Sequence, residues 1–220
     1  MTENNNPYGS GGYQPSEGGT KYFLVKNAAQ LANALAAEKA VVRLTADVAL
    51  EDTTIVTGNI VLDLGSHTIT GANVKLGGIQ VAEGASLTIN ATTGGIRGGS
   101  GADCQALSVL GALNIRGGNF SVGPAASGLG NSCIEVRKNA SEVNIYGGTF
   151  SSDAAYNGWY YVLNVQQTAG VTTPVVKVHG GTFVNYNPAN GDDAIGGNFL
   201  AAGKTVTETV IDGNRIYTVA

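Results

Sequence analysis

The chain has 220 residues, 16 acidic and 12 basic side chains, a formal net charge of −4 and only 13% charged residues. This length is enough for one domain with a substantial core. The sequence has no basic cluster to bind a nucleic-acid backbone and no apolar run near the roughly 18 residues of a membrane-spanning helix. We therefore expect neither nucleic acid nor a membrane as a partner.

The first 20 residues form a segment rich in Gly, Asn, Pro and Ser, without apolar periodicity. Such a composition predicts a flexible tail, in which Tyr8 and Tyr13 are the candidate adhesive side chains. An anchor for a partner and a passive leader both remain open. Met1 to Pro7 contains neither a basic region nor an apolar stretch, so we expect no secretory signal and synthesis in a cytoplasm.

A helix is expected over residues 27–38, after a strand at residues 22–25. Asn27 is a favourable N-cap, Gln30 stands three residues later, and Leu31 and Leu35 begin an apolar stripe at helical spacing. The open end of a solenoid must be covered, and this helix is placed to cover it. A helix that binds a partner is the alternative.

Three near-identical segments occupy residues 113–120, 143–150 and 176–183. Each contains an apolar-polar-apolar triplet, a pair of glycines and a phenylalanine. Repeats 20 to 50 residues long indicate a solenoid, and an apolar spacing of two indicates strands. The pattern thus predicts that Leu113, Val143 and Val176 are stacked neighbours.

Weaker copies extend the pattern towards the N-terminus, and further apolar positions lie between the copies. Similar triplets begin at residues 42, 62 and 87, and a second set covers residues 54–56, 79–81, 107–109, 134–136 and 163–165. A third apolar site follows each corner, at Ile69, Ile96, Phe120, Phe150 and Phe183. Three short strands per repeat predict an all-β protein, a right-handed single-stranded parallel β-helix with coils over about residues 41–205 of a domain covering residues 21–220.

The C-terminal segment predicts an antiparallel hairpin over about residues 206–219, with Asp212-Gly213 at its turn. The hairpin would close the second end of the solenoid or dock on a second copy. This end has no comparable helix, so it is the expected self-association surface.

Two groups of side chains are candidates for ligand binding. The residues before the glycine pairs, Arg116, Tyr146 and His179, would form a column at one corner. Aromatic residues also gather in the loop at residues 151–161, namely Tyr156, Trp159, Tyr160 and Tyr161. The column is also compatible with a row of stacked side chains that only contact solvent. The loop is compatible with sugar stacking, with a subunit contact or with folding down over one repeat of the solenoid.

Neither catalysis nor metal binding is expected from the sequence. Glycoside hydrolysis needs two carboxyl groups about 5 to 9 Å apart, but each outward ladder holds one acid, Asp63 or Glu135. Gly98 to Asp103 fits only the start of a calcium-binding repeat, without a tandem copy. We therefore expect no enzyme and no cofactor. Cys104 and Cys133 lie about one coil apart, and free thiols are favoured while a disulfide remains open.

Residues 42–48 (VRLTADV) and 60–69 (IVLDLGSHTI), with the helix before them, resemble the first coils of the pectate-lyase-like β-helix superfamily. Residues 186–219 are similar to β-helix fibre and decoration proteins of tailed bacteriophages. This second resemblance implies a virion protein, attached to capsid or other virion proteins by its N-terminus and forming a homo-oligomer, with a trimer favoured. No catalytic residues of the superfamily have counterparts here.

These observations together predict a non-enzymatic virion structural protein, a head fibre or capsid decoration. The alternative is a tail-associated fibre that binds a receptor or host-surface glycan through the aromatic loop and the corner column. A polysaccharide depolymerase is a third possibility and the one with the least support from the residues.

Overall fold

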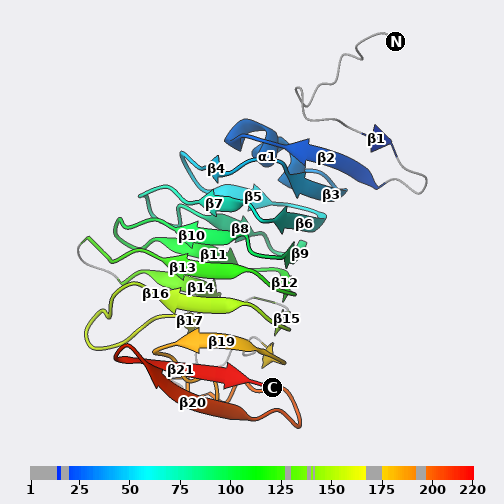
Figure 1. The fold of residues 1–220 in the computed structure, drawn as a ribbon. Coiled ribbons are helices and arrows are strands. Elements are labelled where there is room, and N and C mark those ends of the chain that lie inside the picture. The colour runs from blue at the N-terminus through cyan, green and yellow to red at the C-terminus, as the bar shows by residue number, and fades with distance from the viewer. Residues whose placement is uncertain are drawn as a thin grey trace.

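The computed structural model describes residues 14–15, 20–126, 130–137, 140, 142–166, 175–191 and 197–220. Tyr8, Tyr13 and most of the predicted tail lie outside these residues. The described part contains 21 strands and one helix, so the expectation of an all-β protein is confirmed. The strands form three sheets (Figure 1).

The first sheet contains, in spatial order, β1 (Gln14–Pro15), β2 (Lys21–Val25), β3 (Lys39–Leu44), β6 (Asn59–Gly65), β9 (Ser86–Ala91), β12 (Ala112–Ile115), β15 (Glu142–Ile145) and β18 (Val175–Val178). The second contains β4 (Val48–Ala49), β7 (Thr68–Thr70), β10 (Gly95–Gly98), β13 (Asn119–Val122), β16 (Thr149–Ser152), β19 (Gly181–Val184), β21 (Asn214–Val219) and β20 (Val206–Ile211). The third contains β5 (Thr54–Val56), β8 (Ile79–Val81), β11 (Gln105–Val109), β14 (Ser132–Val136) and β17 (Leu163–Val165).

From β3 to β19, consecutive strands along the chain belong to the first, second and third sheet in turn. Each strand from β3 to β16 pairs in parallel with the strand three places later, as β12 does with β15 and β15 with β18. Figure 1 shows the resulting stack of strands, coloured from blue at the N-terminal end to red at the C-terminal end. Among the named strands of the described part, antiparallel pairing occurs only at the two ends, between β1 and β2 and among β19, β20 and β21.

The core is a column of apolar side chains contributed by successive repeats. The register pairs Leu113 with Val143 and Val143 with Val176, which confirms that these three residues are stacked neighbours. On the second sheet Phe120 stacks on Phe150 with ring centroids 5.2 Å apart, and Phe150 on Phe183 at 4.9 Å. These packed apolar residues are removed from water, which is the main stabilising contribution to such a fold.

The paired glycines explain how the chain turns from the first sheet to the second. The second glycine of each pair has a positive φ, 110° at Gly118, 114° at Gly148 and 123° at Gly181. A Cβ at Gly148 would lie 2.8 Å from the carbonyl oxygen of Gly118 in the preceding repeat. Only glycine combines this backbone conformation with so close an approach.

The helix α1 (Ala28–Leu35) is shorter than the predicted range 27–38. Asn27 caps it as expected, because its Oδ1 accepts a hydrogen bond from the backbone N of Gln30 at 3.0 Å. The helix stops early because β3 begins at Lys39 and pairs with β2, so the chain must leave the helical conformation near Ala36. No helix in the described residues is long and apolar enough to cross a membrane.

The C-terminal hairpin has the predicted bounds, with β20 and β21 antiparallel around Asp212-Gly213. Both turn residues have positive φ, 48° and 79°, the conformation of a type I′ turn. The inner strand β21 pairs with β19, whereas the outer strand β20 ends the second sheet. Val210 and Ile211 of β20 are 67% and 57% exposed, so this edge carries apolar side chains in contact with solvent.

Candidate functional site

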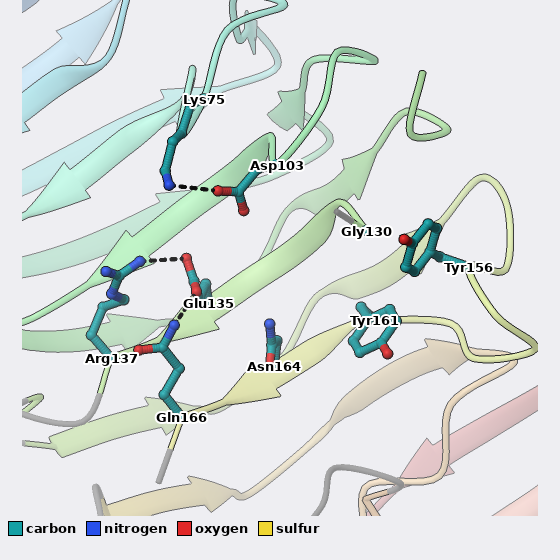
Figure 2. A pocket seen from close by; sticks show the side chains of 9 residues that line it. All are labelled: Lys75, Asp103, Gly130, Glu135, Arg137, Tyr156, Tyr161, Asn164 and Gln166. Atoms are coloured by element: carbon teal, nitrogen blue, oxygen red, sulfur yellow. Dashed lines mark hydrogen bonds and ion pairs between the residues drawn. The ribbon is translucent and has the colours of Figure 1, made fainter. Parts of the chain in front are cut away.

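The outer face of the third sheet carries a polar pocket. Every residue of β11 and β14 is buried, including the outward-facing Ser108 and Glu135, which are 2% and 4% exposed. A cavity of ≈ 400 Å³ lies on this face (Figure 2). The described residues that line it are Lys75, Asp103, Gly130, Glu135, Arg137, Tyr156, Tyr161, Asn164 and Gln166.

Parallel strand pairing brings these residues together from four successive repeats. Asp103, Gly130 and Tyr161 each precede a strand of the third sheet, and the starts of parallel strands meet at one edge. Glu135 and Asn164 are register partners in the middle of β14 and β17. The pocket therefore extends across three neighbouring strands, about 10 Å at ordinary strand spacing.

One end of the pocket is charged, and each charge is paired. Lys75 Nζ lies 3.0 Å from Asp103 Oδ2, and Arg137 Nη1 lies 3.1 Å from Glu135 Oε2. Gln166 Nε2 donates a hydrogen bond to the second oxygen of Glu135, Oε1. The Glu135 side chain is only 5% exposed, and a buried carboxylate needs such partners. Figure 2 shows these pairs on the same side of the pocket.

The other end is aromatic. The rings of Tyr156 and Tyr161 are 6.5 Å apart and inclined at 51°. Tyr156 belongs to a two-residue turn at Asn157-Gly158, in which its backbone N and O exchange hydrogen bonds with Trp159 at 2.8 and 3.0 Å. Gly130 leaves room for the ring, because a Cβ there would lie 2.8 Å from Cδ1 of Tyr156.

The four aromatic residues predicted as one surface are divided by the fold. Tyr156 and Tyr161 line the pocket, whereas Tyr160 packs against the core and Trp159 is 47% exposed outside the lining residues. The reason is that the turn points Trp159 away while the chain enters β17. Tyr160 thus helps to cover the core, whereas ligand contact by Tyr156 and Tyr161 stays a prediction.

Arg116, Tyr146 and His179 follow three aligned strands of the first sheet and form the predicted column. The rings of Tyr146 and His179 are stacked at 4.5 Å, and His179 Nε2 lies 3.3 Å from Asn144 Oδ1. Arg116 and Tyr146 line a shallow depression of ≈ 450 Å³. The column belongs to a different sheet from the polar pocket, and its binding role stays a prediction.

The two cysteines are buried and free. The register pairs Gln105 with Ser132, so Cys104 lies beside Asn131, whose Oδ1 accepts a hydrogen bond from the Cys104 backbone N at 2.8 Å. Burial raises the pKa of the Cys133 thiol to about 12 and also raises the pKa of Cys104. Both are thereby kept as neutral thiols, which are poor nucleophiles.

Sequence reasoning missed seven of the nine lining residues as candidate ligand contacts: Gly130 and the six polar residues Lys75, Asp103, Glu135, Arg137, Asn164 and Gln166. A signal was present, because Glu135 and Arg137 are two apart, as are Asn164 and Gln166 in the next repeat. This spacing places polar side chains on one face of adjacent strands. Lys75 and Asp103 come from loops and gave no such signal.

Among the described residues, no group of three or more His, Cys, Asp and Glu side chains is arranged to hold a metal ion. The pocket offers hydrogen-bonding groups and two aromatic rings instead. Comparison of the chain with protein-family models, curated proteins and solved structures gave no match.

Proposed function

We propose that the three sheets form a right-handed parallel β-helix, with α1 covering its N-terminal end and the β20–β21 hairpin closing the other end. Consecutive strands from β3 to β19 belong to the first, second and third sheet in turn, and this repeating order supports the architecture. The burial of Leu31 and Leu35 against the core supports the role of the helix, since an open solenoid end would expose apolar side chains.

The protein built on this fold is a non-enzymatic structural protein of a bacteriophage virion, a head fibre or capsid decoration. The observation that carries this proposal is the continuous stack of parallel strands, with phenylalanine rings stacked along its core. Such a stack makes a rigid spacer, and the chain has few charged residues. The virion setting is proposed only from the resemblance that the sequence of residues 186–219 suggests. Residues 1–20, with Tyr8 and Tyr13, would attach the spacer to capsid proteins.

Deletion of residues 2–20 tests the attachment. The truncated protein loses β1 but should keep the strands from β2 onward and a β-rich circular dichroism spectrum, and it should be missing from purified particles. A variant with Tyr8 and Tyr13 both changed to Ala should load in reduced amounts. Normal loading of the truncated protein would contradict the head-fibre role.

A second function, glycan binding by a surface fibre, is favoured by the polar pocket. Sugar-binding sites combine aromatic rings with hydrogen-bonding side chains, and here Tyr156 and Tyr161 stand beside Glu135 and Asn164. The pocket is therefore a better candidate for sugar contact than the exposed Trp159.

A glycan array tests this second function with matched variants. Tyr161→Ala should abolish binding, whereas Tyr22→Ala, which removes an exposed tyrosine ring from β2 outside both candidate groups, should leave it unchanged. Absence of binding to any glycan at high protein concentration would exclude the role. Shortening of a capsular polysaccharide on incubation would instead indicate a depolymerase.

A further inference from the structure

We infer that the pocket on the third sheet selects an uncharged saccharide and rejects acidic ones. This inference rests on the glycan-binding function proposed above and adds the chemical class of the ligand. It is carried by the way in which the charges of the pocket are arranged.

The charges of the described lining residues compensate one another. These residues include two cations and two anions, and each cation is paired within the pocket, Lys75 with Asp103 and Arg137 with Glu135. Among these described residues an anionic sugar would find no unpaired cation, and it would lie close to two carboxylates. Repulsion by the nearby carboxylates would offset its attraction to the paired cations.

The aromatic end of the pocket is suited to a sugar ring. Tyr156 and Tyr161 are both half-buried, so each offers part of a ring face to the C–H face of a sugar while its phenol reaches a hydroxyl. Asn164 lies between the two ends in Figure 2. A ligand in this pocket would thus contact ring faces at one end and paired carboxylates and amides at the other, which suits a neutral, hydroxyl-rich molecule.

The test measures binding of wild-type protein to matched neutral and uronic-acid oligosaccharides by calorimetry at low and at high salt. Wild-type protein should bind the neutral series with little dependence on salt. Asp103→Asn frees the charge of Lys75 and should improve binding of the acidic series by up to about fivefold, as expected for one partly exposed charge. Asn suits this position because residue 103 has a φ of 56°.

Lys75→Gln provides the change of opposite sign at an exposed side chain, and it should weaken binding of the acidic series more than binding of the neutral series. Glu142→Gln is the charge-matched control, because it breaks the ion pair with Lys177 outside the pocket and should change neither series. Preference of the wild type for acidic sugars would overturn the inference but leave glycan binding intact. Failure to bind either series would remove both.

Discussion

At the residue scale, the corners of the repeat depend on a glycine that no other residue can replace. We expect Gly148→Ala to lower the free energy of unfolding by about 1–3 kcal/mol, because the new Cβ combines a φ of 114° with a 2.8 Å approach to Gly118 O. Urea denaturation measures the effect. The neighbouring Gly147→Ala is the control, since its Cβ would lie 3.5 Å from Arg116 O, an ordinary contact. Equal losses for both variants would contradict this explanation.

A second residue-scale prediction concerns Cys133, whose pKa burial raises from an ordinary value near 9 to about 12. The unfolded chain releases the thiol proton first, so the stabilising contribution is complete below pH 9 and is lost between pH 9 and 12. The free energy of unfolding should therefore fall by up to about 1.4 kcal/mol per pH unit in this window. For Cys133→Ala, the free energy of unfolding should fall less steeply between pH 9 and 12, by up to about 1.4 kcal/mol per pH unit. If wild type and variant lost stability with pH at the same rate, ionisation of the buried thiol would be excluded as the cause.

At the scale of the element, α1 depends on its first turn. We expect Asn27→Ala to reduce the free energy of unfolding by about 0.5–2 kcal/mol, because the backbone N of Gln30 loses its acceptor. Asn33→Ala, an exposed change within the same helix, should be neutral or slightly stabilising. Thermal unfolding of the two variants provides the comparison. If Asn27→Ala left the midpoint unchanged, the cap would contribute nothing to stability.

At the scale of the whole molecule, β20 is the exposed edge where strand pairing can continue into a second copy. Its unpaired backbone and the side chains of Val210 and Ile211 favour association, as unprotected edges do. We expect wild-type protein to sediment as an oligomer, a trimer by the resemblance, and Val210→Lys to shift it toward monomer. Val74→Lys, the same change at another exposed valine, should have no effect. A wild-type monomer at all concentrations would contradict self-association.

The sequence by itself determined the strands, the stacking of Leu113, Val143 and Val176, and the C-terminal hairpin. These features are repeated or local: an apolar spacing of two fixes which side chains face inward, and Asp212-Gly213 fixes its own turn. Helix α1 was predicted in place but too long, because its end is set by the strand pairing of β3 rather than by helical propensity.

Only the tertiary structure decided the pocket. Lys75, Asp103, Glu135 and Gln166 come from four successive repeats and meet because their strands are side by side in the third sheet. Loop lengths differ between repeats, so sequence spacing could not show which loop residues share an edge. It also could not show that Trp159 turns outward while Tyr161 faces the cavity, because that depends on where the chain re-enters the sheet.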